Sequence, residues 1–151
     1  MLIQNTNFPL ALDAKKIFII NDDISKHDLV VKLVNAACAD TALDKEEILS
    51  AVLKREQGIS TTLDTGLSIP HARVEGLAAF RAAAAVLPKG ITDDYGLEIK
   101  VMFLFLTPAG QAYFPQHLKL LAALAEKFND AFIEQLTVCK NEEEVLRKIS
   151  F

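Results

Sequence analysis

Apolar side chains recur at helical spacing along the first third of the chain. Ser25 is followed three residues later by Asp28, which is the spacing of a side chain that caps the first turn of a helix. The apolar positions after this signal are Leu29, Leu33, Ala36 and Ala37. The pattern therefore predicts a helix that begins near Ser25 and packs one face against the rest of the protein.

The same signal returns at Asp44, which is followed by Glu47. The inward positions of this second predicted helix are Ile48, Leu49, Val52 and Leu53. Gly58 is expected to end the helix, since glycine readily adopts the backbone angles found after a helix C-terminus.

The middle of the chain contains candidate strands. Ile99–Leu106 is the clearest one, because it is rich in β-branched and aromatic residues and almost continuously apolar, as expected of a strand buried on both faces; Thr107–Gly110 is expected to end it. Ala78–Leu87 is interpreted as a strand followed by a turn at Pro88–Gly90, although its alanines also suit a helix. Leu67–Ile69 is a candidate short strand.

Helices are expected again in the last third of the chain. Pro115 suits the first turn of a helix that follows the clearest strand. The apolar positions of that helix are Leu118, Leu121, Ala125 and Phe128, with Leu120 and Leu124 beside them. Two shorter helices are predicted over residues 130–136 and 141–149, the second with Asn141 and Glu144 in capping spacing. Helices that alternate with apolar strands indicate an α/β layered domain.

Composition narrows the class of protein. A length of 151 residues suits a single domain (1–151) with one core. The net charge of −4 argues against nucleic acid as the main partner, because phosphate binding needs a basic face. The first residues lack the pattern of a signal peptide, and the longest apolar run, Ala82–Leu87, is too short to span a bilayer. Cys38 and Cys139 are interpreted as reduced structural thiols, so a cytoplasmic protein without membrane insertion is expected.

The segment from Arg55 to Arg73 stands apart from the rest of the chain. It concentrates arginine, threonine, serine and glycine around one histidine and has no helical or strand period throughout. Pro70 fixes its own backbone angle and restrains Ile69, so His71 follows a stiff dipeptide. A histidine placed this way can be held in a defined orientation, and its charge is the easiest to tune near neutral pH.

Two other histidines complete the set. His27 falls on the polar side of a predicted helix and is interpreted as a solvent-exposed residue. His117 falls in the first turn of the helix that starts near Pro115, where the partial positive charge of a helix N-terminus favours a neutral imidazole and attracts anions such as phosphate. A purely structural role is the alternative for His117, and the same alternative applies to His71.

Several kinds of site are disfavoured. His71 and His117 are 46 residues apart (117 − 71) and neither has a neighbouring ligand at metal spacing, so no metal site is expected. The chain contains no G-x-S-x-G motif, no Walker loop and no G-x-G-x-x-G motif, which argues against a serine hydrolase and a nucleotide site.

Phosphoryl transfer onto an imidazole fits the remaining chemistry. The attacking ring nitrogen must be unprotonated, and the anionic group in transfer needs positive charge and hydrogen-bond donors around it. Arg55 or Arg73 could clamp the phosphoryl oxygens with paired N–H groups. Thr61 and His117 could donate further hydrogen bonds. The hypothesis from residue type is therefore a phosphohistidine site.

The run Arg55-Glu56, Ser60-Thr61, Gly66-Leu67 and Ile69-Pro70-His71 resembles the active segment of a known family. This family is the mannitol/fructose class of enzyme IIA domains of the bacterial phosphoenolpyruvate-dependent sugar phosphotransferase system, which includes the nitrogen-regulatory enzyme IIA. The later segment Pro115–Leu118 is similar to the family's second histidine motif, at the same separation from the first. The similarity covers nearly the whole chain in helix order and in length.

The resemblance implies that His71 is the phosphorylated residue. The residues expected to assist it are Arg55 and His117, which stabilise the phosphoryl group, and Thr61 within the site, with Arg73 and Ser60 as candidate contacts to phosphate or to a partner. The implied fold is an α/β layered sandwich with a mixed β-sheet of about five strands flanked by helices. The implied donor is the histidine phosphocarrier protein, the implied acceptor is a cysteine of an enzyme IIB, and no metal or organic cofactor is implied.

Two functions fit this resemblance. In the first, the chain is a phosphoryl carrier for sugar uptake. In the alternative, it is a nitrogen-type regulatory enzyme IIA whose phosphorylation controls binding to target proteins. Tyr113 and Phe114, beside the second histidine, are candidates for an apolar rim that docks a partner and equally for the core.

Three positions depart from the family pattern. Asp64 stands where glycine is common, Ser68 stands where alanine is common, and Thr65 stands where an acidic or amide residue is frequent. Asp64 would place negative charge near an incoming phosphoryl group if it faced the site.

Overall fold

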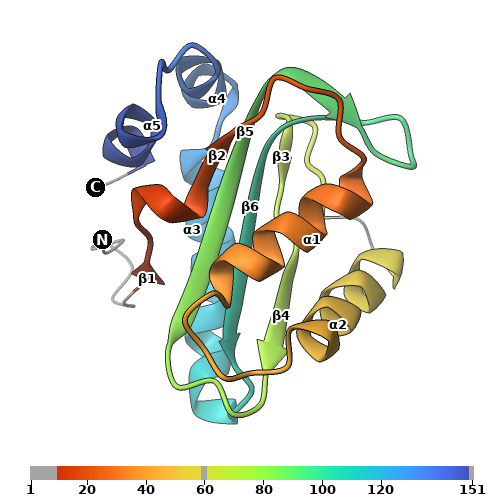
Figure 1. Cartoon of the computed structure of the whole chain (residues 1–151), viewed down its shortest axis with the longest axis vertical. Helices are drawn as coiled ribbons and strands as arrows, with labels where there is room; N and C mark the ends of the chain where they lie inside the picture. Colours follow the sequence, from red (N-terminus) through yellow and green to blue (C-terminus); the bar gives the residue numbers. More distant parts are fainter. Residues whose placement is uncertain (1–9, 59–60, 150–151) are drawn as a thin grey trace.

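The computed structural model describes residues 10–58 and 61–149, and it shows a β-sheet with helices on both faces (Figure 1). The strands are β1 (Leu10–Ala11), β2 (Ile17–Ile19), β3 (Leu67–Ser68), β4 (His71–Val74), β5 (Phe80–Thr92) and β6 (Glu98–Pro108). The helices are α1 (Lys26–Ala37), α2 (Lys45–Gly58), α3 (Phe114–Lys127), α4 (Asp130–Thr137) and α5 (Glu142–Ile149), with 3₁₀ turns η2 (Ala14–Lys16) and η3 (Gln111–Tyr113). The predicted α/β layered fold is confirmed.

The long antiparallel pair β5 and β6 forms the middle of the sheet. β1 and β2 pair in parallel with successive parts of β5, and β3 and β4 pair in parallel with successive parts of β6. The sheet is therefore mixed, and the described residues contribute six strands to it where about five were expected. Because β4 lies at the outer side of β6, groups from both faces of the sheet can meet around it.

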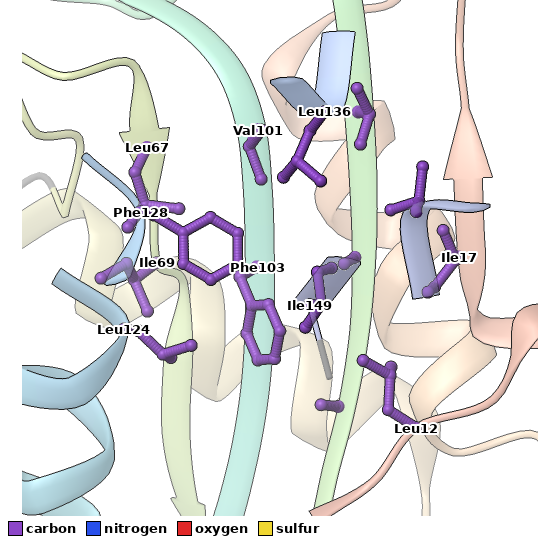
Figure 2. Packing of buried hydrophobic residues seen from close by; sticks show 14 of the residues in the cluster. Leu12, Ile17, Leu67, Ile69, Val101, Phe103, Leu124, Phe128, Leu136 and Ile149 are labelled. Atoms are coloured by element: carbon purple, nitrogen blue, oxygen red, sulfur yellow. The ribbon is translucent and has the colours of Figure 1, made fainter. Parts of the chain in front are cut away.

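The side chains of the two central strands alternate between two hydrophobic layers. Phe103 and Phe105 of β6 point into the layer covered by α3, α4 and α5, whereas Met102 and Leu104 point into the layer covered by α1 and α2. Figure 2 shows Phe103 in the first layer among side chains of the neighbouring elements. On β5, Ala82–Ala85 are fully buried and contribute to the two layers in turn. The predicted burial of β6 on both faces is confirmed.

Short-range capping contacts fix where the helices begin. Ser25 Oγ accepts a hydrogen bond from the amide of Asp28 (3.0 Å) at the start of α1. Asp44 and Asn141 accept in the same way from amides in the first turns of α2 and α5, at 3.0 and 2.9 Å. Each contact satisfies a backbone N–H group that the helix itself leaves without a partner. These starts were predicted, and so was the end of α2 at Gly58.

The turn expected at Pro88–Gly90 is wrong, because β5 continues through these residues. The register with β6 shifts between Val86 and Ile91. Pro88 has no N–H group for the ladder, and Gly90 adopts a positive φ of 71°. The segment therefore bulges out of register, and pairing with β6 resumes beyond it.

The stripe predicted for α3 is also wrong in its rotation. The buried positions are His117, Leu120 and Leu124, while Leu118 is 49% exposed. The expected stripe ran through Leu118, Leu121, Ala125 and Phe128 and did not include His117. In the fold the ring of His117 contacts Thr107 and Phe105 of β6, and the next residue, Leu118, lies toward solvent.

The two cysteines are free and buried, as predicted. Burial raises the pKa of both thiols, which keeps them protonated at neutral pH. Among the described residues, no helix is both long and apolar enough to cross a bilayer.

The buried hydroxyl of Ser68 predicts an effect on the stability of the fold. Its side chain on β3 is fully buried, and its Oγ has no hydrogen-bond partner among the described residues. Because an unpaired buried hydroxyl is unfavourable, Ser68→Ala is expected to raise the free energy of unfolding by about 1 kcal/mol. Thr107→Val is the matched control: it removes a buried hydroxyl that does have a partner, so it should lower the same quantity. Urea unfolding measures both, and a loss of stability in Ser68→Ala would contradict the prediction.

Candidate functional site

His71 is the first residue of β4, and its ring is held from both sides. Its Nδ1 lies 2.7 Å from the carbonyl oxygen of Ile69, and its Nε2 accepts a hydrogen bond from Arg55 Nε at 3.2 Å. A carbonyl oxygen only accepts, so the proton of the neutral ring lies on Nδ1. The lone pair is therefore on Nε2, on the side of Arg55.

The local chain explains why the ring sits there. Pro70 separates β3 from β4, and its carbonyl accepts a hydrogen bond from the amide of Phe105 (3.1 Å). This bond starts the parallel pairing in which His71 lies opposite Phe105. The two rings stack with centroids 5.2 Å apart and planes only 8° from parallel. The ring of His71 is thus fixed by its strand register as well as by hydrogen bonds, and only 2% of the residue is exposed.

His117 comes from the first turns of α3, on the face that packs on the sheet. Its Nδ1 and the Thr107 hydroxyl are hydrogen-bonded at 2.7 Å. Its ring lies edge-on to that of His71, with centroids 5.1 Å apart and planes at 62°. The residue is 4% exposed. The structure therefore brings together His71, Arg55 and His117 from three elements.

Both buried histidines are held neutral. Burial lowers the pKa of His71 below its ordinary value of 6.5 and nearby Arg55 lowers it further, although the bond to Ile69 and the charge of Glu56 act the other way. The pKa of His117 is lowered to about 4, mainly by burial and then by His71 and two arginines. A neutral imidazole was predicted for His117 from its place in the first turn of a helix. In the structure, burial is the largest cause of its lowered pKa.

Arg73 lies on the rim of the site. Its Nη2 donates hydrogen bonds to the carbonyls of Ala109 (2.6 Å) and Gly110 (3.3 Å). Its guanidinium lies 4.7 Å from the centre of the Phe114 ring. The side chain thus ties β4 to the connection before α3, and its charge acts on His117 through space.

Thr61 is bound by a residue for which the sequence indicated no role. Its hydroxyl donates to Glu56 Oε1, and its amide donates to Glu56 Oε2 at 3.3 Å. The one available signal was that Glu56 stands next to Arg55 at the end of a helix, within the run that carries the resemblance. Ser60, the other candidate in this loop, lies outside the described residues.

The surface around the two histidines is partly apolar. Tyr113, Phe114 and Leu118 are 38%, 42% and 49% exposed. Of the two alternatives for the first two residues, exposure on the rim is therefore the one observed. His27 is exposed on α1, as expected.

Asp64 does not line the site. It is exposed and borders a hollow of about 230 Å³ whose other charged lining residues include Lys100 and Glu134. His71 and His117 are not part of that lining. The concern that this carboxylate faces an incoming phosphoryl group does not apply in this structure.

The described part of the chain, residues 10–58 and 61–149, has no group of three or more His, Cys, Asp and Glu side chains placed to hold a metal ion. What it has is a buried, neutral imidazole whose Nε2 carries no proton and accepts a hydrogen bond from a guanidinium, with a second neutral imidazole beside it. A layered α/β protein with such a pair is suited to carry an anionic group on a ring nitrogen.

Comparison with known proteins places the chain in a family. The family model described as "Phosphoenolpyruvate-dependent sugar phosphotransferase system, EIIA 2" matches residues 11–151. The chain belongs to this family, so it is a phosphotransferase component of the enzyme IIA type.

A curated relative agrees with this family assignment. The PTS system fructose-specific EIIA component of Haloferax volcanii is 32% identical over 84 residues, which cover 54% of this chain and 53% of that protein. The chain thus spans about half the length of this curated relative.

Solved structures share the fold. Nitrogen regulatory protein IIA-Ntr from Neisseria meningitidis has a TM-score of 0.80 at 23% identity, covering 93% of this chain and 96% of that one. IIA mannitol from Escherichia coli has a TM-score of 0.76 at 18% identity, covering 93% and 99%. A complex of enzyme IIA mannitol with phosphorylated enzyme IIB mannitol from the same organism aligns with a TM-score of 0.74 at 15% identity, covering 93% and 97%.

The lowered pKa of His117 predicts a pH dependence of stability. Between pH 6.5 and about 4 the unfolded chain takes up a proton on this residue that the folded ring does not. The free energy of unfolding should therefore be highest above pH 6.5 and should fall as the pH drops toward 4, by about 3 kcal/mol from this residue.

Chemical denaturation at several pH values measures this effect. His117→Gln should show a flatter decline over the same window than the wild type. His27→Gln, which changes an exposed histidine, should keep the wild-type slope. Equal slopes for wild type and His117→Gln would show that burial of this ring does not govern the acid sensitivity.

Proposed function

We propose that His71 accepts a phosphoryl group on Nε2 and passes it on. The observation that carries the proposal is the hydrogen bond from Nδ1 to the Ile69 carbonyl, at 2.7 Å, which leaves Nε2 as the nucleophile. The lowered pKa supports it, because the ring is uncharged at neutral pH and carries a lone pair on Nε2. Membership of the enzyme IIA family supports phosphoryl transfer as the reaction.

In the proposed transfer, His71 neither gains nor loses a proton. The Nε2 lone pair forms a bond to phosphorus while the bond between phosphorus and the donor's ring nitrogen breaks, and that electron pair returns to the donor. The ring of His71 becomes cationic, since Nδ1 keeps its proton. Its bond to the Ile69 carbonyl then becomes charge-assisted and stronger.

Arg55 has two successive tasks in this proposal. It first donates to the Nε2 lone pair (3.2 Å), so it must leave that position before the attack. Its exposed side chain can then place paired N–H groups on the phosphoryl oxygens. His117 assists when the Thr107 hydroxyl donates to its Nδ1, because the ring then carries its proton on Nε2 as a neutral donor.

The proposed donor is the histidine phosphocarrier protein, and the proposed acceptor is a cysteine of an enzyme IIB in a sugar-uptake system. Two findings support an enzyme IIB: a structural relative has been solved with a phosphorylated enzyme IIB, and the curated relative is named fructose-specific. Phe114, which is exposed and whose ring stacks near that of His117, gives a docking partner an apolar surface beside the histidines, and the exposed Tyr113 and Leu118 are its neighbours on the chain. Thr61, Arg73 and Ser60 remain candidate contacts.

The first test is phosphorylation of the purified protein by phosphoenolpyruvate, enzyme I and the phosphocarrier protein. Intact mass should show one acid-labile phosphoryl adduct, and NMR of the ring nitrogens should place it on Nε2. His71→Ala should show none, whereas His27→Ala should be phosphorylated like the wild type. Absence of an adduct while a known enzyme IIA is phosphorylated in the same mixture would overturn the proposal.

A second measurement separates the two biological outputs. The phosphorylated protein is mixed with a fructose-class or mannitol-class enzyme IIB. Transfer to the cysteine of the enzyme IIB supports the sugar-uptake role. Retention of the phosphoryl group would instead favour the regulatory alternative, in which phosphorylation controls binding to a target protein.

Arg55 gives a quantitative prediction. Arg55→Met frees the nucleophile but removes the charge that meets the phosphoryl group, so the rate of phosphorylation should fall about 100-fold. Lys54→Met is the control, because it removes an exposed cation from the neighbouring position of the same helix. Rapid-quench measurement of phosphoprotein formation gives both rates. Equal rates for the two variants would exclude a direct role of Arg55.

A further inference from the structure

Glu56 is a buried carboxylate that follows Arg55 in α2. Its side chain is 7% exposed and accepts a hydrogen bond from Lys26 Nζ on Oε2 at 3.3 Å. Two further hydrogen bonds come from Thr61, from its hydroxyl to Oε1 and from its amide to Oε2 at 3.3 Å. One carboxylate thus links α1, the end of α2 and the loop that leads to β3.

The bonds of Thr61 continue toward the nucleophile. The carbonyl of Thr61 accepts from the amide of Ile69 at 3.2 Å. The carbonyl of Ile69 is the group that accepts from His71 Nδ1 at 2.7 Å. A continuous series of hydrogen bonds therefore runs from Lys26 through Glu56, Thr61 and Ile69 to the ring.

The segment between Thr61 and Ile69 contains little regular structure that could hold it in place. β3 has two residues, and the loop before it is closed by the bond from the Leu63 amide to the Leu67 carbonyl (2.7 Å) and a bridge between Thr62 and Ser68. So short a pairing is weak by itself. Fixing Thr61 from outside the sheet also holds the backbone of Ile69, whose amide donates to the Thr61 carbonyl.

Glu56 is also adjacent to Arg55, whose Nε contacts the other ring nitrogen of His71. The carboxylate therefore reaches Nδ1 through Thr61 and Ile69, and its negative charge also acts on the His71 ring through space. A charged group with this little exposure is retained only where its partners are well placed.

We propose that Glu56 is a positioning residue for His71, with Lys26 as its counter-ion. It holds the Ile69 carbonyl where it keeps the proton on Nδ1 and so keeps Nε2 free to act. The inference deepens the proposed phosphoryl transfer and rests on it for its kinetic part. Its structural part, the tautomer of His71, is independent of that transfer.

The experiment has two readouts on the same variants. Nitrogen-15 NMR of the unphosphorylated protein reports which ring nitrogen of His71 carries the proton. Steady-state phosphorylation by the phosphorylated carrier protein gives kcat and KM separately. The variants are Glu56→Gln and Thr61→Val, with Glu47→Gln as the matched control, since Glu47 is an exposed carboxylate of the same helix.

Glu56→Gln is expected to lower kcat about 10-fold, which corresponds to about 1.4 kcal/mol in the barrier, with KM changed less than 2-fold. Its His71 ring should shift from one tautomer toward a mixture of the two. Thr61→Val should act in the same direction, and the double variant should be little worse than either single one, because both break the same series of bonds. Glu47→Gln should match the wild type in both readouts.

If Glu56→Gln does not fold, a second variant tests the proposal. The variant Lys26→Met combined with Glu56→Gln leaves no unpaired charge, so it should fold while Thr61 still lacks its carboxylate. A wild-type tautomer and a wild-type kcat in that folded protein would overturn the inference. If the wild type itself is not phosphorylated, the proposed function fails, and the NMR readout alone decides the role of Glu56.

Discussion

The hydrogen bond between His71 Nδ1 and the Ile69 carbonyl is the contact on which the site depends. It is local, spanning two residues, yet it is fixed by long-range pairing: the carbonyl of Pro70, between the two partners, is bound by the amide of Phe105 in β6. Stacking on the Phe105 ring fixes the plane of the imidazole. The tautomer of the ring therefore follows from the register of β4 on β6, and a slip of one residue would abolish it.

The edge position of β4 explains how one ring can be reached from two layers. Helix α2 packs in the layer of Met102 and Leu104, and α3 packs in the opposite layer with Phe103. Arg55 and His117 come from these two helices and meet at the same ring only because no further described strand lies beyond β4. A histidine in the central strands would have been enclosed by apolar side chains on both faces.

The sequence predicted those features that local interactions decide. Helix starts were correct because a capping residue such as Ser25 acts within one turn, and His71 stood out because Pro70 restricts it locally. The bulge at Pro88–Gly90 was missed because the local signal for a turn is overridden by pairing with β6 on either side of it. The rotation of α3 was missed because the burial of His117 depends on where the helix meets the sheet, which periodicity does not reveal.

The two imidazoles of the site are neutral before the proposed transfer, and the ring of His71 gains a positive charge only during it. Two imidazoles with ring centroids 5.1 Å apart would repel each other if both were protonated, and burial lowers the pKa of both. In the proposed reaction the ring of His71 becomes cationic only when it bonds to phosphorus. The positive charge thus appears together with the negative phosphoryl oxygens and beside the Ile69 carbonyl, which is already oriented toward it. Burial of an uncompensated charge, the largest electrostatic penalty available to this site, is avoided both before and after the transfer.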